Sequence, residues 1–153
     1  MLQTHDRAPP VVARVYCEHP AVNAAVSHYA GLAEQAGIQT DIVLDIPNAL
    51  AVDALELSMV VSNLMENALH ASAQVPAGRV PYLRFTCHRA GRLLLEMENA
   101  CSADATLDEA GQPRVHANGH GIGSKSVAAF AKKYDAELLY RIENGAFRVR
   151  LLV

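Results

Sequence analysis

The sequence has 153 residues, of which 51% are hydrophobic and 19% are charged, and its formal net charge is −3. That length and that balance predict a single globular domain with a substantial core. The weak negative charge and the absence of a basic run argue against a nucleic-acid partner, and no apolar stretch approaches the roughly 20 residues needed to cross a bilayer.

The chain begins with a polar lead-in, predicted to cover residues 1–15, and the domain is predicted to cover residues 16–153. His19–Pro20 opens a helical pattern that stops at Gly37, because proline suits the first turn of a helix and glycine suits its end. An alternating apolar run then predicts a strand over residues 38–46. Three widely spaced cysteines without a CxxC pair predict free thiols in a reducing cytoplasm.

A second helix is predicted from Asp53 to about Ser72. Asp53 and Glu56 have the spacing of a capping box, and the helix that follows is mostly apolar and therefore largely buried. Two strands are then predicted over residues 82–88 and 92–98, followed by a long polar segment over 99–123. A third helix is predicted over 124–134, and a hairpin with strands over 136–142 and 146–153 ends the chain. This order predicts an α+β two-layer sandwich, with helices on one face of a mixed or antiparallel sheet.

Three polar side chains share one face of the second helix. Asn63, Asn67 and His70 follow the spacing i, i+4, i+7. On so apolar a helix, these groups either face solvent or line a ligand pocket. The amide oxygen of an asparagine is a hard ligand suited to Mg²⁺, and a neighbouring histidine can donate to a phosphate.

The stretch NGHGIGSKSV contains three alternating glycines, Gly119, Gly121 and Gly123, directly before a predicted helix. Helix N-termini bind anions, and glycines let phosphate oxygens approach the backbone N–H groups. A turn followed by a helix start explains the glycines equally well. The spacing fits neither a Walker A loop nor a Rossmann fingerprint, because Ser124 separates Gly123 from Lys125 and the glycines do not follow GxGxxG.

Taken together, the two motifs resemble the GHKL superfamily of ATP-binding domains, whose two-layer sandwich is also called the Bergerat fold. Asn63-x-x-x-Asn67 is similar to the N box of a histidine kinase, and residues 119–123 are similar to its G2 box. The peptide-sensing, quorum-sensor type of histidine kinase is closer still. Its first helix begins with NPxxN, which resembles His19-Pro20-x-x-Asn23, and its G2 box is followed by Lys-Ser, as at Lys125 here.

The resemblance implies a binding site for Mg²⁺ and ATP. Asn67 would coordinate Mg²⁺, Asn63 would support the metal or the phosphates, His70 would contact phosphate, and Lys125 would add positive charge nearby. Residues 100–118 would form the ATP lid. The backbone that would wrap the triphosphate belongs to Gly119, His120, Gly121, Ile122 and Gly123.

The sequence departs from the superfamily pattern at two positions. Asn99 stands where an adenine-reading aspartate is usual, and the adjacent glycines are missing, so we expect weaker or less selective nucleotide binding. Asn63 stands where the gyrase-like ATPases carry a glutamate base. An amide cannot accept a proton in that way, so transfer of the phosphoryl group to a partner is expected rather than hydrolysis by water.

The resemblance implies that this chain is the cytoplasmic catalytic domain of a sensor histidine kinase. The parent protein is expected to be anchored in the membrane. Its partners would be the dimerisation domain that carries the phosphoacceptor histidine and, downstream, a response regulator. We expect no direct contact of this domain with the membrane and no nucleic acid. Two alternatives stay open: a free-standing protein-serine kinase of the anti-sigma-factor type, and an interaction module that no longer binds nucleotide.

Overall fold

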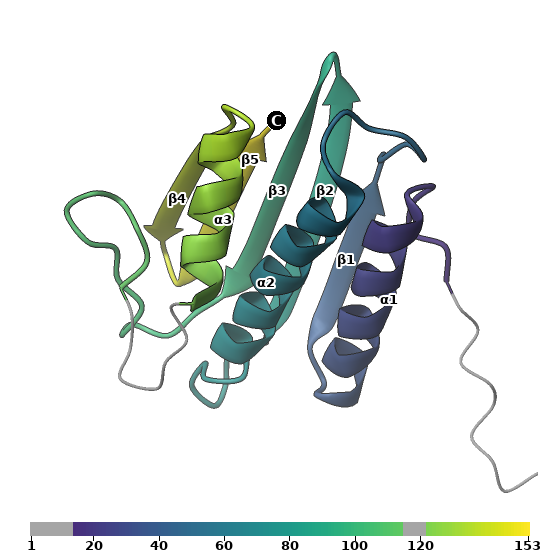
Figure 1. The fold of residues 1–153 in the computed structure, drawn as a ribbon. Helices are drawn as coiled ribbons and strands as arrows, with labels where there is room; N and C mark the ends of the chain where they lie inside the picture. Colours follow the sequence, from purple (N-terminus) through teal and green to yellow (C-terminus); the bar gives the residue numbers. More distant parts are fainter. Residues whose placement is uncertain (1–13, 115–121) are drawn as a thin grey trace, which may run out of the picture.

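The computed structural model describes residues 14–114 and 122–153. In these residues a five-stranded sheet carries three helices on one of its faces (Figure 1). The helices are α1 (Pro20–Gln35), α2 (Ala54–Ser72) and α3 (Ile122–Lys133). The strands are β1 (Gln39–Leu44), β2 (Tyr82–Ala90), β3 (Arg92–Ala100), β4 (Glu137–Glu143) and β5 (Ala146–Leu152). The predicted α+β two-layer sandwich is confirmed.

The sheet is mixed, with strand order β1-β2-β3-β5-β4. β1 and β2 are parallel and are joined through α2, whereas the other neighbouring strands are antiparallel. The C-terminal strand of the hairpin, β5, therefore lies between β3 and β4 and connects the hairpin to the rest of the sheet (Figure 1).

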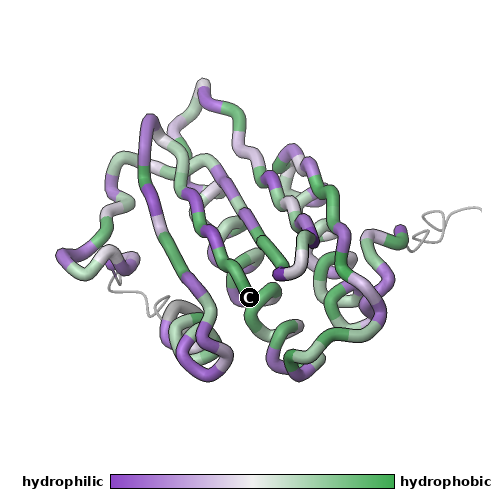
Figure 2. Tube along the Cα trace, turned by 90° about the horizontal axis from the view of Figure 1, so that it is seen from above, coloured by the Kyte–Doolittle hydropathy of each residue, from purple (hydrophilic) through white to green (hydrophobic). Residues whose placement is uncertain are grey.

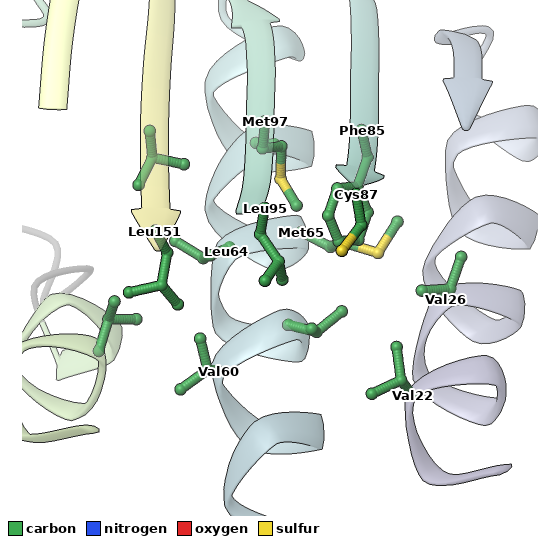
Figure 3. Close-up of a cluster of buried hydrophobic side chains, with 14 of the residues drawn as sticks. Val22, Val26, Val60, Leu64, Met65, Phe85, Cys87, Leu95, Met97 and Leu151 are labelled. Atoms are coloured by element: carbon green, nitrogen blue, oxygen red, sulfur yellow. The ribbon is translucent and has the colours of Figure 1, made fainter. Parts of the chain in front are cut away.

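The hydrophobic core lies between the sheet and the helices. Residues alternate between buried and more exposed along β2 and β3, and the alternating hydropathy of the strands is visible in Figure 2. Figure 3 shows apolar side chains of α1 and α2 directed toward the strands, among them Val26 and Met65, which are both fully buried. Phe85 of β2 and Leu151 of β5 are also fully buried, so the core extends from the β1–β2 side of the sheet to β5.

Side chains from the preceding segments cap the starts of α1 and α2. The His19 Nδ1 atom accepts a hydrogen bond from the backbone N–H of Val22 (3.2 Å). Asp53 Oδ2 accepts a bond from the N–H of Glu56 (2.9 Å). The predicted capping box is only half formed, because the Glu56 carboxylate accepts bonds from Lys133 Nζ (2.6 Å) and the Tyr134 hydroxyl (2.8 Å) instead. Glu56 thus ties α2 to the end of α3.

Some predicted boundaries were wrong by one or two residues. β3 continues to Ala100 because that residue pairs with Ala146 of β5, so Asn99 lies inside the strand and not after it. β1 is shorter than residues 38–46, and α3 begins at Ile122, two residues before the predicted start. The Asn-Gly hairpin is confirmed, with positive φ at Asn144 (52°) and Gly145 (75°). Most of the predicted lead-in lies outside the described residues. No helix in the described part of the chain is long and apolar enough to span a membrane.

Candidate functional site

The polar stripe of α2 borders a cavity of about 120 Å³. Asn67 and His70 are among the residues that line it, so this part of the stripe does not simply face solvent. Asn67 is half-buried, and His70 is exposed with its Nε2 atom 3.0 Å from Gln74 Nε2. Asn63 lies one helical turn earlier and is half-buried, but it is not among the described residues that line the cavity.

The floor of the cavity is formed by three neighbouring strands. Two registered rows of side chains cross β3, β5 and β4 on the face that the helices cover. The first row is Met97, Val149 and Tyr140, and the second row is Asn99, Phe147 and Ile142. Five of these six side chains are apolar or aromatic, so the floor offers a flat, mostly apolar surface with a carboxamide at one corner.

Asn99 is the polar group of the second row, and its residue is only 2% exposed. Its Nδ2 atom donates a hydrogen bond to the backbone carbonyl of Ala100 (2.9 Å). Only the NH₂ side of a carboxamide can donate to a carbonyl, so this bond fixes the orientation of the amide. Asn99 can then offer a ligand its side-chain carbonyl oxygen as an acceptor and the second N–H of its amide as a donor.

The segment that follows β3 forms the wall opposite α2. This segment belongs to the polar stretch predicted over residues 99–123, and within it an antiparallel bridge joins Leu107 and Pro113. Asp108 Oδ1 accepts hydrogen bonds from the backbone N–H groups of Ala110 and Gln112 (both 2.9 Å). A single carboxylate therefore organises the tip of this segment.

Arg79 holds the junction between this segment and the sheet. Its guanidinium donates to the carbonyl of Cys101 (2.8 Å) and to the carbonyl of Gly145 (2.9 Å). The Cys101 N–H also donates to the Gly145 carbonyl (2.9 Å). No sequence signal marked Arg79, because its role depends on two carbonyl groups far away in the sequence.

Burial keeps two cavity-lining groups in their protonated forms. It raises the pKa of the Cys101 thiol, which the nearby Arg79 lowers in part. Burial also raises the pKa of the Tyr140 hydroxyl to about 12. Both groups are therefore neutral at physiological pH.

The predicted glycine-rich motif lies mostly outside the part of the chain that the structure describes. Gly119, His120 and Gly121 fall in the segment that is not described. Ile122 and Gly123 belong to the first turn of α3, and Lys125 is exposed on the same helix. The described residues that line the cavity come from α2 and the turn after it, from residues 101–114 and from β3, β5 and β4.

Asn67, His70 and Asn99 were predicted from the sequence and line the cavity, whereas the apolar and aromatic residues of the floor were not predicted. The alternation of β4 and β5 predicts which of their residues share a face, and this signal points to Tyr140, Phe147 and Val149 once the strands are paired. Which face meets a cavity depends on the position of β5 between β3 and β4, which no local pattern specifies.

Solved structures with the same fold include several histidine kinases. The catalytic domain of the histidine kinase ThkA superposes with a TM-score of 0.69 at 12% identity, covering 88% of this chain and 91% of that chain. The mycobacterial sensor histidine kinase MprB gives a TM-score of 0.65 at 12% identity, covering 88% and 93%. The histidine kinase AdeS of Acinetobacter baumannii gives 0.60 at 13% identity, covering 88% of this chain and 62% of that one.

No curated protein matches the sequence. The profile of the GHKL domain, in contrast, matches residues 52–153, from the segment before α2 through all three strands of the cavity floor. This span contains both asparagines of the cavity, Asn67 and Asn99, and the glycine-rich motif. The chain therefore belongs to the GHKL family.

Proposed function

We propose that this domain binds Mg²⁺-ATP and transfers the γ-phosphoryl group to a histidine on a separate dimerisation domain, as the catalytic part of a sensor histidine kinase. The observation that carries the proposal is the cavity. It combines a buried carboxamide in an apolar floor (Asn99) with a second carboxamide on its helical wall (Asn67). The similarity in fold to histidine kinase catalytic domains agrees with this proposal.

The floor suits a purine base. Its apolar and aromatic side chains can contact the flat faces of a base, and Asn99 can read one edge. Because Asn99 Nδ2 is already engaged with Ala100, its side-chain oxygen is the group that would accept from the amino group of adenine. Guanine presents an oxygen at the same place, and two acceptors repel. We therefore expect a preference for adenine without the help of a formal charge.

The phosphates would lie toward Asn67. Its carboxamide oxygen fits Mg²⁺, which prefers hard oxygen ligands and is usually held by few protein groups together with waters and phosphates. Mg²⁺, when bound, neutralises negative charge on the phosphates. His70 is placed on the same wall and would contact a phosphate oxygen. The backbone of residues 119–123 and the side chain of Lys125 are proposed to complete this end of the site.

Transfer to a partner is favoured over hydrolysis because Asn63 cannot act as a base. The chain would then contribute positioning and charge neutralisation, which phosphoryl transfer mainly requires. The acceptor would be the dimerisation domain of the parent kinase, which we propose to be membrane-anchored, and a response regulator would act downstream. The proposal includes the peptide-sensing, quorum-sensor type of histidine kinase, because His19-Pro20-x-x-Asn23 and residues 119–126 resemble the motifs of that type.

The first prediction concerns Asn67. Replacing Asn67 by alanine removes the proposed ligand of Mg²⁺, so thermal stabilisation by Mg²⁺-ATP should fall from several degrees to near zero. Asn48→Ala is the matched control, since Asn48 is exposed in the segment before α2 and does not line the cavity. Differential scanning fluorimetry of the wild type and both variants, with and without Mg²⁺-ATP, measures the effect.

The outcome that contradicts the metal assignment is equal stabilisation of Asn67→Ala and the wild type. Absence of any heat of binding at millimolar ATP, with the wild-type domain folded, would instead favour an interaction module without nucleotide.

A further inference from the structure

Arg79 is connected to the ligand cavity by hydrogen bonds, although it is not among the described residues that line the cavity. The residue is exposed, and its guanidinium donates to the carbonyls of Cys101 (2.8 Å) and Gly145 (2.9 Å). Ordering an exposed arginine costs side-chain entropy, and a charge-assisted bond to each carbonyl offsets that cost. Both bonds lie where β3 ends and the cavity wall formed by residues 101–114 begins.

The Gly145 carbonyl links Arg79 to the backbone at the end of β3. It accepts from Arg79 Nη2 and also from the backbone N–H of Cys101, each at 2.9 Å. The Cys101 N–H belongs to the same peptide group as the Ala100 carbonyl. This peptide group is trans and planar, so its N–H and C=O point in opposite directions and turn together. Holding the N–H at Gly145 therefore fixes the direction of the Ala100 carbonyl.

The Ala100 carbonyl in turn holds the carboxamide of Asn99. It accepts from Asn99 Nδ2 (2.9 Å), and both residues are buried, with 0% of Ala100 and 2% of Asn99 exposed. The direction of this carbonyl decides which end of the carboxamide is bonded, because only the NH₂ end can donate to it. A series of hydrogen bonds therefore connects the exposed guanidinium of Arg79 to the buried amide of Asn99, which lines the cavity.

We propose that Arg79 is a positioning residue for the bound nucleotide. It fixes the peptide group between Ala100 and Cys101, and through that group it holds the Asn99 carboxamide in one orientation. Arg79 itself does not contact the ligand. Without Arg79, the Cys101 N–H is the only one of the two donors left on the Gly145 carbonyl, so the peptide group can turn. This inference rests on the proposed function, in which Asn99 contacts the base.

The test is Arg79→Ala, assayed by isothermal titration calorimetry. Mg²⁺-ADP should bind about 3- to 10-fold more weakly, because the carboxamide is no longer held in one orientation. Adenosine should lose affinity by a similar factor, since Arg79 acts on the end of the cavity that would hold the base. Arg79→Lys is the second variant. It keeps the charge but lacks the planar fork that donates to two carbonyls, so it should also bind Mg²⁺-ADP more weakly than the wild type.

A spectroscopic signature distinguishes positioning from a general role in stability. In NMR spectra of the ligand-free wild type, the Asn99 side-chain proton that is bonded to the Ala100 carbonyl should exchange slowly with solvent. In Arg79→Ala the same proton should exchange faster, because its acceptor can turn away. Asn99→Asp lacks the side-chain NH₂ signals, so its spectrum assigns them.

Arg92→Ala is the matched control. Arg92 also donates to a backbone carbonyl, that of Leu152 (3.2 Å), but it lies at the other end of β3. This variant should melt at a lower temperature than the wild type and bind Mg²⁺-ADP with unchanged affinity.

Three outcomes overturn the inference. If both Arg79 variants bind Mg²⁺-ADP as tightly as the wild type does, Arg79 does not position the site, while the proposed function stands. If Arg92→Ala loses as much affinity as Arg79→Ala, the effect is a general loss of stability. If the Asn99 side-chain proton exchanges at the wild-type rate in Arg79→Ala, the hydrogen bonds do not carry the effect. Failure of the wild type to bind Mg²⁺-ADP would refute the proposed function itself.

Discussion

Glu98 and Asn99 are neighbours in β3 whose side chains lie on opposite faces of the sheet. Asn99 faces the helices and the cavity, whereas Glu98 faces the open side. There the Glu98 carboxylate accepts bonds from the Tyr82 hydroxyl and from Arg148 Nε, both at 2.6 Å. Asn99 would thus contact a ligand, while Glu98 connects β2, β3 and β5.

A prediction at this scale concerns the pH dependence of stability. Burial alone would raise the pKa of Glu98, but the hydrogen bonds from Tyr82 and Arg148 and the charges of Arg148 and Arg84 lower it below its ordinary value. A lowered pKa in the folded state means that the ionised carboxylate stabilises the fold at neutral pH. That contribution is lost as the pH falls through the lowered pKa.

Glu98→Gln should therefore lower the free energy of unfolding by about 1–2 kcal/mol at pH 7, and the deficit should shrink as the solution is acidified below pH 4. Urea unfolding at a series of pH values measures both. Glu96→Gln is the control, because Glu96 makes a longer and more exposed pair with Arg150 (3.4 Å) and should have a smaller effect. A loss of stability in Glu98→Gln that does not change with pH would contradict the assignment of the ionised Glu98 carboxylate as the stabilising group.

At the scale of elements, the start of α1 shows why His19-Pro20-x-x-Asn23 is a structural motif. His19 caps the helix, and Asn23 Oδ1 accepts from the backbone N–H groups of Tyr16 (2.6 Å) and Cys17 (3.3 Å). These bonds hold the incoming chain against the first turn of α1. The motif thus has a role in folding, whatever it indicates about the type of kinase.

Asn23→Ala should destabilise the domain by about 1–2 kcal/mol, because two backbone donors lose their acceptor. Asn23→Asp keeps acceptor oxygens and adds negative charge to the first turn of a helix, so it should be close to the wild type in stability. Guanidinium unfolding compares the two variants. Equal destabilisation by both would show that the acceptor oxygen is not what matters.

The elements themselves were predictable from the sequence, because helical periodicity, strand alternation and the Asn-Gly turn are local signals. The errors in the predicted boundaries and caps occurred where contacts between residues distant in the sequence determine the local structure. β3 reaches Ala100 because it pairs with Ala146, and the capping box is half formed because Glu56 meets Lys133 and Tyr134. In the site, Asn67 could be predicted from helical spacing, whereas Tyr140 lines the cavity because β4 pairs with β5, which no local pattern specifies.

At the scale of the whole molecule, Arg79 connects three parts of the chain. It lies before β2 and donates to carbonyls at the end of β3 and in the turn between β4 and β5. Gly145 permits this contact, since a Cβ atom there would lie 2.7 Å from Arg79 Nη2. Its φ of 75° also disfavours any side chain.

This arrangement predicts non-additive mutations. Gly145→Ala should cost about 2–3 kcal/mol in the wild type, from backbone strain and from displacement of the Arg79 guanidinium. In the background of Arg79→Ala, the same substitution should cost only the strain, about 1 kcal/mol. A double-mutant cycle by chemical denaturation measures the difference. Strict additivity would mean that the two residues do not interact.

The position of β5 has a consequence for how the protein acquires its cavity. β5 supplies the centre of the floor, yet it pairs with β3 across a long stretch of intervening sequence. Bringing such distant strands together is entropically expensive and tends to be slow. Species in which the hairpin has not yet docked have no floor to offer a nucleotide. Binding of ligand should therefore discriminate against every incompletely assembled form and report on the final step of assembly.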